Sequence, residues 1–190
     1  MGFYKNEELA KLGFQYLGKN VKISDRASIY NHDQISIDDN SRIDDFCVLS
    51  GKITIGKNVH IAVFCNLAGG EKGITMEDFS GLAYHCNVFT QSDDYTGKTL
   101  TNPTVPDEFK LERKDKIHIG KHVIVGTNSV IFPGVTLSEG CSIGAMTMVT
   151  KSTEPWMIYS GVPAKPIKER KKDLLVQEEL YLAQLEVNQG

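Results

Sequence analysis

The stretch that decides the fold runs from Ile119 to Val149 and reads IGKHVI VGTNSV IFPGVT LSEGCS IGAMTM V. An aliphatic residue recurs at every sixth position, at 119, 125, 131, 137, 143 and 149, without a miss. The fifth place of each hexad holds a small or β-branched residue. This period predicts a parallel β-solenoid, in which each hexad forms one short strand and one bend, and successive coils stack at about 4.8 Å.

The same period extends upstream, with insertions, from about Leu17 to Phe89. All four cysteines fit it, because each lies four residues after the aliphatic residue that opens its hexad; they are Cys47, Cys65, Cys86 and Cys141. That place points inward in a solenoid. We therefore interpret the cysteines as reduced core thiols and not as disulfide partners or nucleophiles.

A chain of 190 residues suits one domain with a substantial core. Within it the sequence predicts an N-terminal helical cap over residues 1–16, the β-solenoid over 17–165 and a C-terminal helix over 166–190. The fold class is thus mainly β. One long polar loop, residues 91–116, interrupts the solenoid.

The two terminal helices have recognisable signals. The first, Asn6–Gly13, has an asparagine at its start, early acidic residues and a closing glycine. The second places Leu175, Leu182 and Leu185 on one apolar stripe, with Glu178 elsewhere on its surface. We expect the second helix to pack on the solenoid or on a neighbouring subunit.

Charge and hydropathy exclude several partners. With 21 basic and 24 acidic residues the formal net charge is -3, so nothing in the chain predicts binding to nucleic acid or to an anionic membrane. No secretion signal and no run of eighteen apolar residues is present. The sequence predicts a soluble, cytoplasmic protein without membrane insertion.

The loop at 91–116 is the most distinctive departure from the period. A loop of this length inside a compact domain is more often functional than idle. Asp93, Asp94 and Tyr95 stand at its root. We expect it to form the rim of a substrate pocket against a neighbouring subunit.

The hexads, the loop and the segment TKSTEPWMIYSGVPAKPIKER at 150–170 resemble the hexapeptide-repeat acetyltransferases, specifically the sugar and xenobiotic O-acetyltransferase group that includes the galactoside and maltose enzymes. The resemblance covers about residues 17–170, and Gly161–Lys168 is its most specific part. It implies a left-handed β-helix, a homotrimer, and active sites in clefts between subunits. The implied activity is acetyl transfer from acetyl-CoA to a sugar or nucleotide-sugar acceptor.

The resemblance also implies where acetyl-CoA binds. Six residues match family positions that contact the pantetheine arm and the nucleotide: Thr127, Ala145, Thr150, Lys151, Ser160 and Lys165. Of these, Ser160 and Lys165 match the positions at the adenine and the ribose phosphate. A cation suits the phosphate because that group is dianionic.

Acetyl transfer needs a base, donors for the developing oxyanion, and a site that orients both substrates. The family's usual base is a histidine at the loop root, but this chain has no histidine between His85 and His118. Two candidates remain open. Asp93 matches the position by spacing, whereas His85 offers an imidazole, the side-chain type best suited to general-base catalysis at neutral pH. Asn66 matches a family asparagine that orients the acceptor or supports the base.

Three further residues are candidate acceptor contacts. Tyr84 and Tyr95 have rings that can stack on a sugar, and Asp94 is a second carboxylate beside Asp93. The sequence leaves open which sugar is the acceptor and whether its acylated group is a hydroxyl or an amine.

Two alternatives to an active acetyltransferase follow from the missing loop histidine and from the other histidines. One is a catalytically weak or inactive relative that keeps CoA binding. The other is a γ-type zinc carbonic anhydrase, with His85, His118 and His122 as metal ligands. The Gly161–Lys168 segment favours the acetyltransferase, for which we expect no metal.

Overall fold

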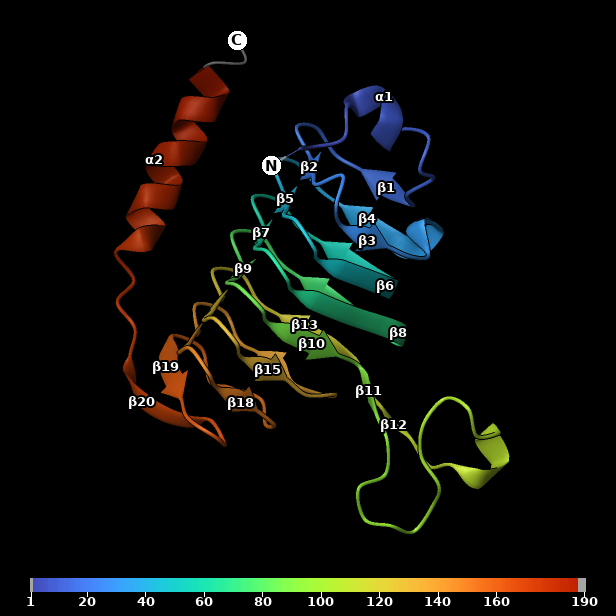
Figure 1. Ribbon diagram of the computed structural model, residues 1–190. Helices are drawn as coiled ribbons and strands as arrows, with labels where there is room; N and C mark the ends of the chain where they lie inside the picture. The colour runs from blue at the N-terminus through green and yellow to red at the C-terminus, as the bar shows by residue number, and fades with distance from the viewer. Residues whose placement is uncertain (1, 188–190) are drawn as a thin grey trace.

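The hexads form short strands that wind into a three-faced parallel β-solenoid (Figure 1). The structure is a computed structural model that describes residues 2–187. Seven parallel strands line the first face, called face A: β2 (Lys22–Ile23), β5 (Arg42–Ile43), β7 (His60–Ile61), β9 (Gly81–Leu82), β14 (Ile124–Val125), β17 (Ser142–Ile143) and β19 (Met157–Ser160). The predicted solenoid is confirmed.

The other two faces share a pair of long strands, β6 (Val48–Ile55) and β8 (Asn66–Met76), which bend from one face to the next. Face B contains their first halves together with β3 (Ser28–Ile29), β10 (Asn87–Phe89), β15 (Val130–Ile131) and β18 (Met148–Val149). Face C contains their second halves together with β1 (Tyr16–Leu17), β4 (Ile35–Ile37), β13 (Ile117–Ile119) and β16 (Thr136–Leu137). We name the three edges AB, BC and CA after the faces that they join.

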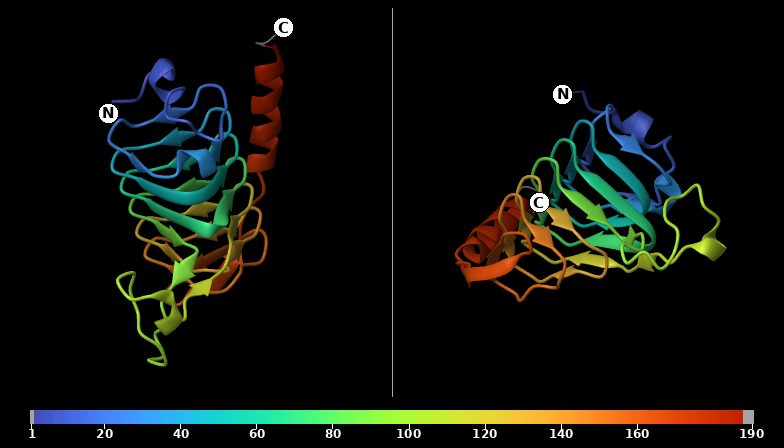
Figure 2. Two further views of the ribbon diagram at one scale, coloured as in Figure 1. Left: turned by 90° about the vertical axis from the view of Figure 1, so that its right-hand side faces the viewer. Right: turned by 60° about the horizontal axis from the view of Figure 1, so that its bottom comes forward.

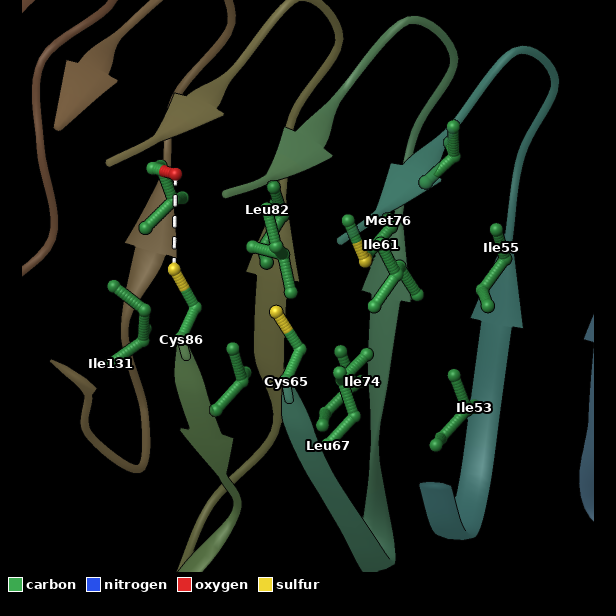
Figure 3. Close-up of a cluster of buried hydrophobic side chains, with 14 of the residues drawn as sticks. Ile53, Ile55, Ile61, Cys65, Leu67, Ile74, Met76, Leu82, Cys86 and Ile131 are labelled. Carbon is green, nitrogen blue, oxygen red and sulfur yellow. Dashed lines mark hydrogen bonds between the residues drawn. The ribbon is translucent and has the colours of Figure 1, made fainter. Parts of the chain in front are cut away.

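The core is a column of aliphatic side chains and cysteines along the solenoid axis. Ile61, Cys65, Leu67, Leu82 and Cys86 point into this interior from neighbouring coils (Figure 3). Each is at most 2% exposed, so the burial of apolar surface is the main force that stabilises the coils.

The cysteines are all buried and free, as the sequence predicts. Contacts with Cys47 and Cys86, together with burial, raise the pKa of the Cys65 thiol, and burial raises that of Cys141. A raised pKa keeps these thiols protonated and unreactive at neutral pH.

The N-terminal helix is shorter than the sequence predicts. Helix α1 spans Asn6–Leu9, and its N-cap is Lys5 instead of Asn6. The backbone N–H of Lys5 donates to the Glu8 carboxylate at 2.7 Å. Lys5 can therefore serve as the N-cap in place of the expected Asn6, because the Glu8 carboxylate accepts the backbone N–H of Lys5.

The C-terminal helix also begins later than expected. Helix α2 spans Leu174–Val187, and residues 188–190 lie outside the described part of the chain. The preceding strand β20 (Lys165–Glu169) pairs antiparallel with β19, so the segment predicted as helix from 166 starts as a hairpin. Pro166 lies in this strand, and proline disfavours a helix interior because it lacks an N–H donor.

Helix α2 runs back along edge CA toward the N-terminal coils (Figures 1 and 2). Glu178, expected away from the packed side, faces the solenoid: its carboxylate lies 2.6 Å from Lys121 Nζ and 2.9 Å from His122 Nε2. Leu182 is 42% exposed, although the sequence places it on the apolar stripe. The helix is therefore held by charged contacts as much as by apolar ones. Within residues 2–187 no helix is long and apolar enough to cross a membrane.

The long loop leaves edge BC on a stalk of two antiparallel strands, β11 (Gln91–Ser92) and β12 (Arg113–Lys114). It contains one 3-10 turn, η2 (Asp107–Phe109), and a second such turn, η1 (His32–Gln34), lies near the N-terminus. The loop projects away from the solenoid body (Figure 2). Its predicted position is confirmed.

Candidate active site

His85 lies at a bend on edge AB and presents its imidazole to solvent. Its backbone has φ 58°, in the left-handed region, and its N–H donates to the carbonyl of Val63 on the previous coil at 3.1 Å. The ring stacks on Phe64 with centroids 4.7 Å apart, and Phe64 stacks in turn on Phe46 at 5.0 Å. Within residues 2–187 neither ring nitrogen has a hydrogen-bond partner. The imidazole is thus held in position and is free to exchange a proton.

The residues expected to contact the pantetheine arm continue along this edge. The N–H of Asn128 donates to the carbonyl of Tyr84 at 2.9 Å, and the N–H of Met146 donates to the carbonyl of Thr127 at 2.8 Å. Thr127 and Ala145 therefore stack on one edge, as their spacing of one coil predicts. The structure adds that His85 lies one coil before Thr127 on that same edge.

Close packing of these coils requires a glycine at position 126. A Cβ built on Gly126 would lie 2.5 Å from the backbone nitrogen of Ala145, which has no room to move. Any larger residue would push the two coils apart. The distance between these two coils on edge AB therefore depends on the lack of a side chain at Gly126.

The remaining expected cofactor residues lie at the C-terminal end of the solenoid. Thr150 and Lys151 directly follow β18, and Ser160 pairs with Lys165 across the β19–β20 hairpin. The carbonyl of Gly161, in the turn of that hairpin, accepts the N–H of Met148 at 3.1 Å. The hairpin therefore packs on β18, the strand that follows the Ala145 bend, whereas Thr150 and Lys151 lie beyond the other end of β18, on edge BC.

Asn66 lies near His85 through the ladder of face B. It is the first residue of β8, and its partner in register on β10 is Asn87. The side-chain amide of Asn87 donates to the carbonyl of His85 at 3.3 Å. Two asparagines on neighbouring coils thus lie beside the histidine.

Asp93 does not lie near His85 within one chain. Strand β10 crosses face B between them, so His85 stands on edge AB and Asp93 at the loop root on edge BC. Asp93 Oδ1 accepts the backbone N–H of Asn102 at 3.3 Å. No hydrogen bond or ion pair joins the two candidate bases in the part of the chain that the structure describes.

Asp94 organises the loop. Its carboxylate accepts the backbone N–H groups of Thr96, Lys98 and Thr99 at 2.8, 3.0 and 3.2 Å. Hydrogen bonds from Thr96, and then from Lys98 and Thr99, lower its pKa to about 2. A carboxylate with so low a pKa is a weak base. The sequence reasoning missed this structural role, although an aspartate two residues before a threonine in a polar turn is a recognised Asx-turn signal.

The two candidate sugar-stacking tyrosines are not brought together. Tyr84 is 54% exposed on edge AB and lines a cavity of about 680 Å³ between face A and helix α2. Tyr95 is 89% exposed on the loop beyond edge BC. Their roles as acceptor contacts stay predictions.

The three histidines of the zinc alternative also lie apart. His85 is on edge AB, His118 is on β13 of face C beside Glu77 at 3.2 Å, and His122 is buried on edge CA against Glu178. Within residues 2–187 no three histidine, cysteine or carboxylate side chains come close enough to hold one metal ion.

Comparison with known proteins gives a clear answer on family. No protein-family model matches the chain. The dTDP-4-amino-4,6-dideoxy-D-glucose acyltransferase of Escherichia coli is 41% identical over 184 residues, which cover 95% of each protein. AntD, an N-acyltransferase from Bacillus cereus solved in complex with dTDP and 3-hydroxybutyryl-CoA, superimposes with a TM-score of 0.96 and 48% identity over 98% of this chain and 100% of its own.

A maltose O-acetyltransferase from Clostridium difficile 630 shares the fold at a TM-score of 0.59 but is only 20% identical, over 87% of this chain and 75% of its own. The near-complete correspondence thus lies with these two acyltransferases, and the resemblance to the maltose enzyme extends to the fold alone. The two acyltransferases match 95% and 98% of this chain. The chain therefore belongs to the hexapeptide-repeat family of acyltransferases.

Proposed function

We propose that the chain transfers an acyl group from an acyl-CoA to the 4-amino group of a dTDP-4-amino-4,6-dideoxyhexose. The observation that carries this proposal is the correspondence over 95% of both chains with an enzyme named for that acceptor. The complex of the Bacillus cereus protein with dTDP and 3-hydroxybutyryl-CoA supports both substrates.

Acyl-CoA lies along edge AB in this proposal. Thr127 and Ala145 stack there one coil apart, and Lys165 at the hairpin offers a cation to a phosphate of the nucleotide. The donor predicted from the sequence is acetyl-CoA. Because the Bacillus cereus complex contains a four-carbon hydroxyacyl group, longer donors belong in the same test.

The site is completed between copies of the chain in a homotrimer. His85 on edge AB and Asp93 on edge BC lie at opposite ends of β10, so one chain does not bring them together. In a closed ring of copies, the loop of one copy can reach edge AB of the next. This arrangement puts both candidate bases beside one cleft.

His85 acts as the general base. It takes a proton as the amine nitrogen attacks the thioester carbonyl, the C–N bond forms, and the C–S bond then breaks to release CoA as the thiolate. The protonated imidazole returns the proton to the sulfur, so the histidine ends each cycle neutral. Asn66 helps to orient the amine through the face B ladder.

The experiment compares two acceptors that differ in one group. CoA thiol release is followed with dTDP-4-amino-4,6-dideoxyglucose and with its 4-hydroxy counterpart, using acetyl-CoA and 3-hydroxybutyryl-CoA as donors, and the products are identified by mass. We expect turnover with the amine and little with the hydroxyl. Release from neither acceptor would refute the proposal, and preference for the hydroxyl would refute N-acylation.

Variants test the base. His85→Gln should lower kcat by at least about a hundredfold while acyl-CoA affinity is kept, because a general base contributes roughly 10²–10⁴ in rate. His32→Gln, on edge BC, is the matched control and should leave kcat unchanged. If instead Asp93→Asn removes turnover and His85→Gln does not, the carboxylate at the loop root is the base.

A further inference from the structure

A cationic cavity of about 380 Å³ opens on face C, beside the bend where β6 and β8 turn from face B. Figure 1 shows β6 and β8 side by side in the middle of the stack of coils. Three lysines contribute to its lining, together with threonines and a histidine: Lys52, Lys72, Lys116, Thr54, Thr75 and His118. No carboxylate side chain lines it among the residues that the structure describes.

The three lysines come from three consecutive coils. Three isoleucines pair in register on neighbouring strands: Ile53 on β6, Ile74 on β8 and Ile117 on β13. Lys52 directly precedes Ile53, Lys116 directly precedes Ile117, and Lys72 lies two residues before Ile74. Coils are about 4.8 Å apart, so the three lysines lie along one narrow strip of the surface. Like charges on neighbouring strands destabilise a sheet unless a counter-charge lies between them.

That counter-charge is not supplied by the chain itself. Within residues 2–187, no carboxylate lies within 4.0 Å of the ammonium group of Lys52, Lys72 or Lys116. Two nearby carboxylates have other partners, since Glu77 contacts His118 at 3.2 Å and Asp115 contacts Arg113 at 3.5 Å. Glu71, directly before Lys72 in the sequence, does not line the cavity. Other lysines of the same region are paired, as Lys114 is with Glu112 at 3.0 Å.

We propose that this cavity binds a diphosphate group, with the three lysines supplying charge and the threonine hydroxyls supplying hydrogen bonds. Ammonium groups bind phosphate oxygens through short charge-assisted hydrogen bonds. The hydroxyls of Thr54 and Thr75 have no partner in the described chain and are open to the cavity.

The position of the cavity favours the nucleotide sugar as the source of the diphosphate. It lies on face C near edge BC, and Lys116 stands between the returning strand β12 of the loop and β13. The acyl-CoA edge, AB, is on the other side of the solenoid. This assignment of the occupant rests on the proposed function, whereas the binding of a diphosphate does not.

Titration calorimetry with four probes tests the proposal: inorganic pyrophosphate, dTDP, CoA and thymidine. We expect dTDP and pyrophosphate to compete for one site on the unmodified protein. Thymidine, which has no phosphate, should not bind at this site. Lys52→Ala and Lys116→Ala should each raise the Kd for dTDP about tenfold, the effect of losing one charge-assisted contact. Added salt should weaken binding further.

Two controls separate charge from folding. Lys52→Arg keeps the charge and should keep the affinity for dTDP, and Lys22→Ala removes an exposed lysine from face A and should change nothing. Unchanged dTDP affinity in the Lys52→Ala, Lys116→Ala double variant would overturn the proposal. A loss confined to CoA would overturn the nucleotide sugar as the occupant.

The outcomes also separate this inference from the proposed function. If the unmodified protein binds dTDP through these lysines but acylates no amino sugar, the proposed function fails and the diphosphate site stands. If it acylates the amino sugar while the double variant keeps its dTDP affinity, the proposed function stands and the diphosphate site fails.

Discussion

Replacement of Glu178 by glutamine should loosen helix α2 from the solenoid. The carboxylate is only 11% exposed and contacts Lys121 Nζ at 2.6 Å and His122 Nε2 at 2.9 Å. The other polar contact of the helix with the coils is the hydroxyl of Tyr181, which donates to Asn58 Oδ1 at 3.1 Å. Glu178 is therefore the main charged anchor of α2 within residues 2–187.

The magnitude follows from the environment of the carboxylate. Burial alone would raise the pKa of Glu178, but Lys121 and His122 more than offset burial and hold it below its ordinary value. A hydrogen bond to a charged group contributes roughly 1.5–3 kcal/mol, and Lys121 is partly exposed, so we expect Glu178→Gln to weaken docking by about 1.5 kcal/mol. That free energy corresponds to roughly a tenfold increase in the population of the undocked helix.

The dependence on pH has a definite sign. A carboxyl whose pKa is lowered in the docked state contributes its full stabilisation above its ordinary pKa of about 4.3 and loses it as pH falls through the lowered value. Below neutrality, docking should therefore persist to about pH 4 and weaken at lower pH. In the Glu178→Gln protein this acid-induced step should be absent.

Two assays report on the helix. Amide hydrogen exchange over residues 174–187 measures its opening at pH 7, and the single tryptophan, Trp156, gives a fluorescence signal because its ring lies 6.3 Å from that of His122. Glu179→Gln, the exposed neighbour, is the matched control. Equal exchange in the two variants would show that the carboxylate of Glu178 does not hold the helix.

Three further outcomes are expected. Leu67→Ala should lower the free energy of unfolding by about 3 kcal/mol in denaturant titrations, because the side chain is 0% exposed and leaves a cavity. The four cysteines, with Cys65 as the most protected, should resist a thiol reagent in the native protein and react fully after unfolding. Gly126→Ala should weaken acyl-CoA binding and stability together, because its Cβ would collide with the backbone of Ala145, and unchanged affinity would contradict the proposed cofactor edge.

The coils were predictable because a solenoid repeats one simple physical requirement. Each hexad must bury one aliphatic and one small residue, so Ile131, Leu137 and Ile143 recur at a fixed spacing that survives insertions elsewhere. The burial of Cys65 and Cys86 follows from the same rule. Stacking of Thr127 on Ala145 was also predictable, since a separation of eighteen residues is one full coil.

The details outside the coils depend on partners that are far away in the sequence. Glu178 faces inward because Lys121 and His122, more than fifty residues earlier, stand on edge CA. Residues 166–169 form a strand because β19 offers them an antiparallel partner. Neither partner leaves a local signal in the C-terminal segment.

The separation of His85 from Asp93 could not be predicted from the sequence for a different reason. Eight residues apart in sequence, they stand on two edges of a prism, because β10 runs straight across the face between them. Sequence proximity in a solenoid therefore says little about proximity in a site. Residues at the same position of neighbouring coils, such as Tyr84 and Thr127, lie closer together than residues at the two ends of one strand, such as His85 and Asp93.

The stalk β11–β12 makes the loop a separable module. Strand β8 pairs with β10 before the loop and with β13 after it, so the ladder continues as though residues 93–112 were not there. The chain closes at the base of the stalk, where the N–H of Asp115 donates to the carbonyl of Thr90 at 2.9 Å. Loops of other lengths and compositions can therefore be grafted at this point without disturbing the scaffold, which gives evolution or an engineer a way to vary the loop while the coils are kept.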